Sequence, residues 1–176
     1  MLYYLDIETF SPSVPNPKKD KILSIQFCPL DFKGNVCGDL TILKEWEKGE
    51  EEIVRIFNRI LERKGKWGFV PVGYNLNFEW RFLYEKFRKY SLPQIDFLSR
   101  PYLDLMHTAL LMNGRFKGCK LSAFTSKKED GGVIARYYKK GRFDLIEDYI
   151  LDEAQAFCSL YKKLCRLRFL RRFILL

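Results

Sequence analysis

The chain has 176 residues, of which 47% are apolar and 16% aromatic, and this composition excludes a disordered protein. The length predicts a single domain over residues 1–176, and no run of about 18 uncharged apolar residues is present, so neither a membrane span nor a membrane partner is expected. The formal net charge of +9 favours a polyanionic partner, nucleic acid before a membrane surface.

Three strands are predicted in the first 45 residues. Residues 2–7 have the pattern of a buried strand, residues 21–28 alternate between two faces, and residues 38–45 follow a turn. The prolines between positions 11 and 17 predict a loop after the first strand. Strands separated by such short connections favour an antiparallel meander.

Helices alternate with strands in the rest of the chain. Apolar residues repeat at a spacing of three and four over residues 53–61, behind the acidic turn Glu50–Glu52 that suits a helix dipole. The later elements are predicted as a strand at 67–72, a helix at 77–90, a strand at 102–106, helical segments near 107–113 and 120–125, and a long helix from about 143 towards 172. This order predicts an α/β fold with a mixed five-stranded sheet, three antiparallel strands and then βα units, flanked by helices.

The first predicted strand carries two carboxylates, Asp6 and Glu8. Alternate side chains of a strand point to the same face, so these two acids would stand side by side and repel each other. A hard divalent cation such as Mg²⁺ or Mn²⁺ would relieve that repulsion, since such ions prefer carboxylate oxygens. The alternative is an exposed strand end that is merely acidic.

The fourth strand leads into a helix through the segment from Gly73 to Glu79. Asn75 is a good helix-capping residue, and Glu79 would lie in the first helical turn, where a negative charge is favoured. Taken alone, this segment also fits an ordinary helix start.

An acid interrupts the apolar stripe of the long C-terminal helix. The stripe comprises Ile146, Ile150, Glu153, Phe157, Leu160 and Leu164. Tyr149 precedes Glu153 by four residues and lies on the same side, whereas Asp152 falls on the outer side. A charge placed among apolar neighbours needs a partner or a metal ion, unless Glu153 is a partly exposed boundary residue.

Three motifs give the chain a family resemblance. Asp6-Ile7-Glu8 matches Asp-x-Glu in strand one, Gly73 to Glu79 matches Gly-x-Asn-x-x-Phe-Asp, and Tyr149 to Glu153 matches Tyr-x-x-x-Asp. In this order, over roughly residues 1–165, the chain resembles the DEDD 3′-to-5′ exonuclease superfamily, which has a ribonuclease H-like fold. The tyrosine of the third motif is similar to that of the tyrosine (DEDDy) subgroup.

Two residues depart from the family pattern. Glu79 and Glu153 stand where aspartate is usual, and each carboxylate is one methylene longer. Because magnesium demands near-octahedral oxygen ligands, the two longer side chains either fit a slightly wider site together or mark a weakened enzyme. Asp152 is an alternative fourth carboxylate, and Glu153 is favoured because the apolar stripe points it inward.

The resemblance implies a metal-dependent 3′-to-5′ exonuclease that hydrolyses phosphodiester bonds of DNA or RNA with two Mg²⁺ or Mn²⁺ ions. It assigns metal binding to Asp6, Glu8, Glu79 and Glu153, and the orientation of the attacking water to a fifth catalytic residue, Tyr149. It places Thr9, Phe10, Asn75 and Phe78 around the terminal nucleotide. The alternatives are a catalytically impaired member that binds nucleic acid or a replication or repair partner, and a protein-interaction scaffold.

Two basic segments lie outside these motifs. Residues 135–143 interleave basic and aromatic residues, which suits a single-stranded nucleic acid but also fits a solvated loop and helix start. Residues 159–176 contain six basic residues and no acid, and are expected to form a basic, apolar helix that packs on its own domain. A protein partner is the main rival for that helix, and a membrane surface the third.

The remaining signals concern the compartment. The start of the chain lacks the basic residues and cleavage site of a secretion signal, and the five cysteines are odd in number and lack metal-type spacing. We therefore expect a cytoplasmic protein with reduced thiols. A zinc site is not expected, since His107 is the only histidine.

Overall fold

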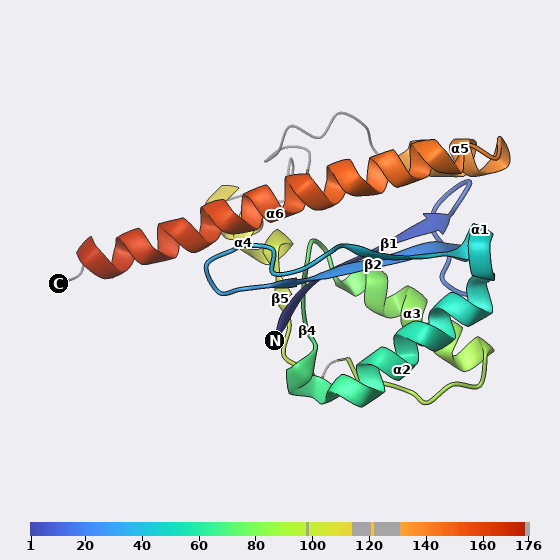
Figure 1. The fold of residues 1–176 in the computed structure, drawn as a ribbon, viewed down its shortest axis with the longest axis horizontal. Helices are drawn as coiled ribbons and strands as arrows, with labels where there is room; N and C mark the ends of the chain where they lie inside the picture. Colours follow the sequence, from blue (N-terminus) through green and yellow to red (C-terminus); the bar gives the residue numbers. More distant parts are fainter. Residues whose placement is uncertain (98, 114–120, 122–130, 175–176) are drawn as a thin grey trace.

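Five strands form one mixed sheet in the computed structural model, which describes residues 1–97, 99–113, 121 and 131–174 (Figure 1). The strands are β1 (Leu2–Phe10), β2 (Lys21–Leu30), β3 (Thr41–Lys44), β4 (Val70–Gly73) and β5 (Leu103–Asp104). Across the sheet their order is β3-β2-β1-β4-β5. Neighbours among β1, β2 and β3 pair antiparallel, whereas β4 runs parallel to β1 and β5 parallel to β4. The predicted α/β fold with a mixed five-stranded sheet is confirmed.

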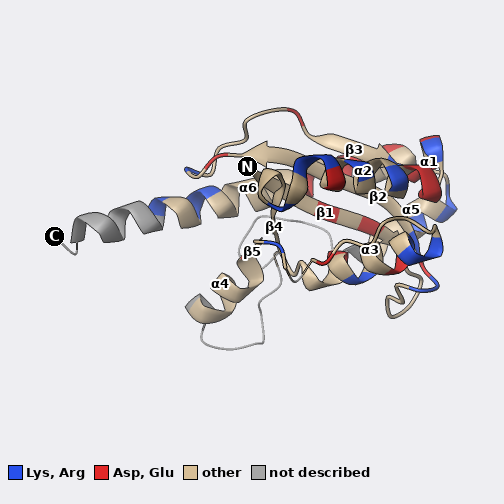
Figure 2. Cartoon of the chain, turned by 90° about the horizontal axis from the view of Figure 1, so that it is seen from below, with Lys and Arg blue, Asp and Glu red and all other residues tan. Residues whose placement is uncertain are grey.

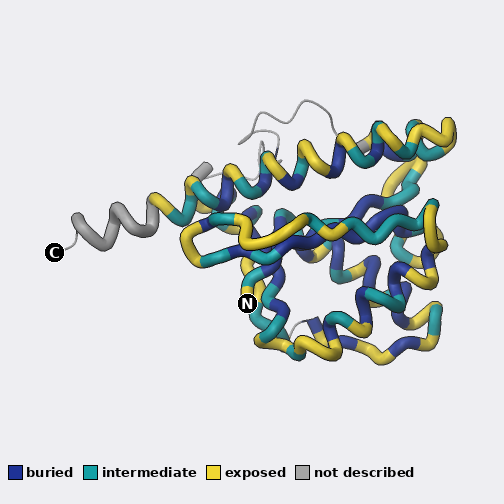
Figure 3. The backbone as a smooth tube through the Cα atoms, viewed as in Figure 1, coloured by how far each residue is buried: buried dark blue, intermediate teal, exposed yellow. Residues whose placement is uncertain are grey.

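Helices cover both faces of this sheet. They are α1 (Glu45–Lys48), α2 (Glu50–Gly68), α3 (Asn77–Lys89), α4 (Leu105–Asn113), the 3-10 turn η2 (Gly131–Val133), α5 (Ile134–Lys139) and α6 (Phe143–Ile174). The helices α2 and α3 lie on one side of the central strands and α6 runs along the other (Figure 1). Buried residues follow both interfaces (Figure 3), so the sheet is the middle layer of three.

The alternation of side chains along β1 decides which face of the sheet carries the acidic residues. Tyr3, Leu5 and Ile7 belong to the core that packs on α2 and α3. Tyr4 points to the opposite face, where it joins the apolar cluster of α6. Because side chains alternate along a strand, the acids at positions 6 and 8 share the face of Tyr4 and are directed towards α6.

Some predicted boundaries are wrong. The strand expected at 67–72 begins only at Val70, because α2 continues past a bend at Gly65, where φ is 63°, and includes Trp67. Trp67 is 68% exposed, so its apolar character does not reflect burial in the sheet. The strand expected at 38–45 is limited to β3, and the residues after it form the short helix α1. Of the helical segment expected near 120–125, only Leu121 lies within the described residues.

The long helix α6 extends from the sheet towards the C-terminus (Figure 1). Its predicted apolar stripe is confirmed, since Ile146, Ile150, Phe157 and Leu160 are all buried. The helix packs on its own domain at least as far as Cys165, which contacts the cluster around Tyr4. Among the described residues, no helix combines the length and the apolar character that a bilayer crossing requires.

Candidate functional site

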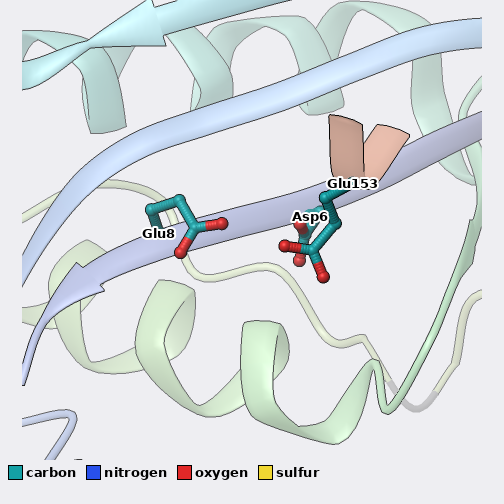
Figure 4. Close-up of side chains that lie close together, drawn as sticks. All are labelled: Asp6, Glu8 and Glu153. Atoms are coloured by element: carbon teal, nitrogen blue, oxygen red, sulfur yellow. The ribbon is translucent and has the colours of Figure 1, made fainter. Parts of the chain in front are cut away.

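Three carboxylates from two distant segments meet on the α6 face of the sheet. Asp6 and Glu8 project from β1 and Glu153 from α6 (Figure 4). Each can place one oxygen within 4.8 Å of an oxygen of the other two. Like charges this close repel strongly, so the arrangement favours a bound cation or proton uptake.

Asp6 is held in place by neighbours on its own strand and on β2. The Tyr4 hydroxyl donates a hydrogen bond to Asp6 Oδ2 at 3.2 Å, and Gln26 Nε2 donates to the same oxygen at 3.1 Å. Ser24 Oγ in turn donates to Gln26 Oε1 at 3.0 Å, and both Ser24 and Gln26 are fully buried. Burial, followed by the charge of Asp6, raises the pKa of Tyr4 well above its usual value, so the phenol stays a donor.

The roles of Ser24 and Gln26 were missed at the sequence level. Both face the same side of β2, and the register pairs Gln26 with Asp6 and Ser24 with Glu8. The available signal was a pair of alternating polar residues in an otherwise apolar strand. Polar side chains at such positions need buried partners, and here Ser24 bonds Gln26 while Gln26 bonds Asp6.

Glu79 approaches Asp6 from the first turn of α3. Its side chain is 3% exposed, and its Oε2 is buried without a hydrogen-bond partner among the described residues. Burial raises the pKa of Glu79 well above its usual value, and the adjacent charge of Asp6 raises it further. A buried carboxylate oxygen without a donor is a position that a cation would satisfy, so these residues fit the divalent metal ions that the sequence predicts.

The turn before α3 differs from the predicted cap. Asn75 has a left-handed backbone (φ 68°) and does not cap the helix; the capping position is Leu76, which has no side-chain cap. Asp104 at the end of β5 accepts hydrogen bonds from the backbone N–H groups of Asn75 at 2.8 Å and Leu76 at 2.9 Å. A carboxylate from a distant strand therefore stabilises the turn that leads into α3, and the helix itself has no side-chain cap.

A glycine at the start of this turn is required by close packing. A Cβ at Gly73 would lie 2.9 Å from the carbonyl oxygen of Leu5 and 2.4 Å from a methyl group of Leu76. The close approach of β4 to β1 is what brings the turn, and with it Glu79, next to Asp6. Packing therefore explains why the second motif has a glycine at position 73, since a larger residue would clash with Leu5 and Leu76.

Tyr149 lies one helical turn before Glu153 and is hydrogen-bonded to it. The hydroxyl donates to the carboxylate, and the ring is 7% exposed. Burial raises the pKa of Tyr149 far above its ordinary value, and the charges of Glu8 and Glu153 add to the effect. The raised pKa favours the protonated phenol, which can donate a hydrogen bond.

A pocket of about 360 Å³ opens over these groups. Its lining includes all but one of the nine predicted site residues, namely Asp6, Glu8, Thr9, Asn75, Phe78, Glu79, Tyr149 and Glu153. Phe10 is the exception: it packs on Tyr138 with ring centroids 5.5 Å apart, under the ammonium group of Lys139. Asp152, the alternative fourth carboxylate, is exposed and does not line the pocket.

Comparisons with known proteins identify the fold. No protein-family model and no curated protein sequence matches the chain. E. coli exonuclease I in complex with a dT13 oligonucleotide is similar in structure, with a TM-score of 0.55 and 14% identity over 69% of this chain and 34% of that chain. An ExoI/SSB-Ct complex has a TM-score of 0.55 and 13% identity, and the match covers 85% of this chain and 43% of that chain. Exonuclease I (apo) has a TM-score of 0.54 and 13% identity, and the match covers 69% of this chain and 35% of that chain.

These similarities establish an architecture. The chain has the open, mixed sheet flanked by helices of these ribonuclease H-like exonucleases. It spans between 34% and 43% of the length of the three structures named.

Proposed function

We propose that the chain is a metal-dependent 3′-to-5′ exonuclease of the tyrosine (DEDDy) subgroup, which hydrolyses phosphodiester bonds of DNA or RNA. The observation that carries the proposal is the convergence of four carboxylates, three with oxygens within 4.8 Å of one another and the fourth buried beside Asp6. They line a pocket in an exonuclease-type fold, next to the tyrosine of the third motif.

Asp6, Glu8, Glu79 and Glu153 would hold two Mg²⁺ or Mn²⁺ ions. Such ions supply Lewis-acid activation of water and stabilise negative charge on the phosphate and the leaving oxygen. The chain itself contributes orientation: Tyr4 and Gln26 hold one oxygen of Asp6. Glu79, whose Oε2 has no donor among the described groups, lies beside Asp6 and follows the turn that Asp104 stabilises.

Tyr149 would position the attacking water. Its hydroxyl is anchored on Glu153, and its raised pKa keeps the proton on the phenol. A neutral phenol can donate a hydrogen bond to a phosphate oxygen or orient a water molecule, whereas proton abstraction would need a lower pKa. We therefore assign Tyr149 a positioning role.

The terminal nucleotide would lie in the pocket between β1 and the start of α3. Thr9, Asn75 and Phe78 line that space. The ring of Phe78 packs on that of Phe82 with centroids 4.9 Å apart, and it offers a surface on which a base can stack. Phe10 does not line the pocket, so we propose that it contacts the next nucleotides of the nucleic-acid strand, beside Lys139. The comparison structure with dT13 supports a single-stranded 3′ end as the substrate.

The test is a cleavage assay on one oligonucleotide labelled at its 5′ end, in single- and double-stranded form. With Mg²⁺ or Mn²⁺ we expect a ladder that shortens from the 3′ end, which a chelator abolishes. Asp6→Asn should remove the activity. A matched pair on α6 separates the two candidate acids: Glu153→Gln should abolish cleavage and Asp152→Asn should leave it unchanged.

A second measurement tests the metal site without activity. Adding Mn²⁺ to the chelator-treated protein should raise its Tm, since an ion that binds only the folded state at a hundred times its Kd stabilises it by about 2.7 kcal/mol. The rise should disappear in Asp6→Asn. Binding of the oligonucleotide without cleavage in either ion would favour a catalytically impaired protein that binds nucleic acid. The absence of both binding and cleavage would favour a protein-interaction scaffold.

A protein partner and a place in the cell are further parts of the proposal. The comparison structure with SSB-Ct is a protein complex, which supports a protein contact for this chain as well. We propose that the basic C-terminal part of α6 provides it, in a cytoplasmic protein of DNA repair. Removal of residues 167–176 should then abolish partner capture without changing cleavage of a short oligonucleotide.

A further inference from the structure

A second cavity lies between α6 and the β2–β3 connection, away from the carboxylates. Its volume is about 620 Å³, and it shares no lining residue with the carboxylate pocket. The lining is mostly apolar and neutral, and it includes two cysteines, Cys28 of β2 and Cys158 of α6. Neither cysteine has a role in the proposed nuclease chemistry.

The two thiols line the same cavity from opposite sides, one from β2 and one from α6. Cys28 is 2% exposed and Cys158 is half-buried, and both belong to the apolar cluster between the sheet and α6. The Cys158 thiol donates a hydrogen bond to the Cys28 sulfur, which lowers the pKa of Cys28 against the effect of burial. The same hydrogen bond, together with burial, raises the pKa of Cys158. Of the two thiols, Cys28 therefore has the more favoured thiolate, which is the nucleophilic form of a cysteine.

The backbone around this pair is fixed on both sides. Gly34, in the turn after β2, approaches α6 so closely that a Cβ there would lie 2.5 Å from the Cα of Lys162, one turn beyond Cys158. On the preceding turn, the ring of Phe157 packs on Tyr4 of β1 with centroids 4.8 Å apart. The two cysteines therefore line one cavity between elements that are already docked on each other.

We propose that Cys28 and Cys158 form a reversible disulfide that joins α6 to β2, with a hydroperoxide entering through the cavity as the oxidant. The Cys28 thiolate attacks one oxygen of hydrogen peroxide and breaks the O–O bond, which gives a sulfenic acid and hydroxide. The Cys158 sulfur then attacks the Cys28 sulfur and displaces the second hydroxide. The two thiol protons convert both hydroxides to water, so two thiols are oxidised to one disulfide and the peroxide is reduced to two waters.

The bond would act on the helix that carries Tyr149 and Glu153. It would close a loop of more than a hundred residues, and cross-links of long loops stabilise folded proteins mainly by restricting the unfolded chain. The proposal stands without the nuclease assignment, because it rests on the thiol pair, the cavity and the docking of α6.

The test treats the full chain with an equimolar amount of hydrogen peroxide and digests it under non-reducing conditions for mass spectrometry. We expect one cross-linked peptide pair that contains Cys28 and Cys158 and lacks two hydrogen atoms. The oxidised protein should have a Tm higher by roughly 5–15 °C, and dithiothreitol should reverse both changes. Hydrogen exchange within residues 143–166 should slow on oxidation.

Matched variants decide the outcome. Cys158→Ser, at a half-buried position, should keep the fold and lose both the cross-link and the Tm rise, as should Cys28→Ser. Cys37→Ser, at an exposed cysteine of the same connection, should retain both. A cross-link to any other cysteine, a product that stops at Cys28 sulfinic acid, or an unchanged Tm after complete cross-linking would overturn the proposal.

Discussion

Among the described residues, Glu79 has a buried carboxylate oxygen that no hydrogen-bond donor reaches. It is buried, its Oε2 has no donor among the described groups, and burial together with Asp6 raises its pKa. Burial and the neighbouring charge therefore disfavour the ionised carboxyl unless a cation lies beside it. Its length matters too, because the aspartate usual in the resembling family would place the oxygens one methylene farther from Asp6.

Glu79→Asp tests that length. A displacement of about 1 Å at a catalytic group costs on the order of a hundredfold in rate, so we expect single-turnover cleavage to fall by about that factor. The Tm of the chelator-treated protein should not fall, since the change removes no hydrogen-bond donor. Glu85→Asp on the same helix, next to Arg88 at the surface, makes the same change and should leave the rate unaltered. Full activity in Glu79→Asp would contradict a site matched to the longer side chain.

At the scale of elements, the docking of α6 on the sheet decides whether Glu153 meets the acids of β1. The helix is held along its apolar stripe and at the turn after β2, where Gly34 touches the backbone of Lys162. Tyr161 adds a long hydrogen bond of 3.5 Å from its hydroxyl to the carbonyl oxygen of Asp31. A change at this turn therefore acts on the site from a distance.

Gly34→Ala should destabilise the fold in two ways. The left-handed backbone (φ 86°) strains any other residue by roughly 1–3 kcal/mol, and the added Cβ would meet the Lys162 backbone at 2.5 Å. Gly49→Ala is the control, since Gly49 has φ 83° with no atom within 4 Å of the added Cβ. We expect the Gly34 variant to lose more unfolding free energy in a denaturant titration. Equal losses would show that the contact with α6 contributes nothing.

A second set of contacts ties α2 and α3 to β2 on the other face of the sheet. Glu50 at the start of α2 accepts hydrogen bonds from the Ile22 N–H at 2.8 Å and from Lys89 at 2.8 Å, and forms a buried ion pair with Lys86 at 3.0 Å. Burial raises the pKa of Glu50, but Lys89, Tyr90 and the other donors outweigh it, and the net pKa lies below its ordinary value of 4.5.

This lowered pKa makes the stability depend on pH. A carboxyl with a lower pKa in the folded state stabilises the fold above pH 4.5, and this stabilisation is lost as the pH falls through the folded-state pKa. Glu50→Gln should therefore cost about 3–5 kcal/mol near pH 7, where it leaves the buried Lys86 ammonium without a carboxylate partner. The difference from the native chain should shrink below pH 4.5 in denaturant titrations.

Glu51→Gln is the control for that titration. Glu51 pairs with Arg55 at the surface of the same helix, and an exposed pair contributes less than about 1 kcal/mol. A pH-independent difference between Glu50→Gln and the native chain would contradict the role assigned to Glu50.

On the scale of the whole molecule, acidic and basic residues are segregated around the site. The acids of β1 lie near the basic helix α5, at the same end of the sheet (Figure 2). Lys139 and Lys140 are exposed there, and Lys139 lies 5.7 Å from the ring of Phe10. With a net charge of +9, the molecule suits a strand whose phosphates contact α5 while its end reaches the carboxylates.

Salt should weaken that contact in a measurable way. The logarithm of the affinity for a single-stranded oligonucleotide should fall linearly with the logarithm of salt concentration, by about 0.7 per phosphate contacted. Lys139→Ala should reduce the magnitude of the slope by about 0.7. Lys66→Ala, at the opposite end of β1, removes the same charge and should leave the slope unchanged. Identical slopes for both variants would show that the nucleic-acid strand does not contact α5 at Lys139.

Local patterns in the sequence were enough to predict the layers of the fold and to select most of the residues that line the carboxylate pocket. The alternation of β1 placed Asp6 and Glu8 on one face, and the stripe of α6 singled out Glu153 over the exposed Asp152. Both predictions depend only on the period of a strand or a helix, which neighbouring residues encode. The bend at Gly65 shows where this fails, because an apolar run cannot tell a buried strand from an exposed helix end.

Only the tertiary structure decided which distant residues lie next to the carboxylates of the pocket and bond to them. The register of β1 and β2 places Gln26 on Asp6, and β5 brings Asp104 to the turn before α3, where Asn75 had been expected to act. Packing alone brought Cys28 and Cys158 together across 130 residues of chain. Such contacts depend on sheet order and helix docking, which result from the burial of the whole core and are not encoded in any short stretch of residues.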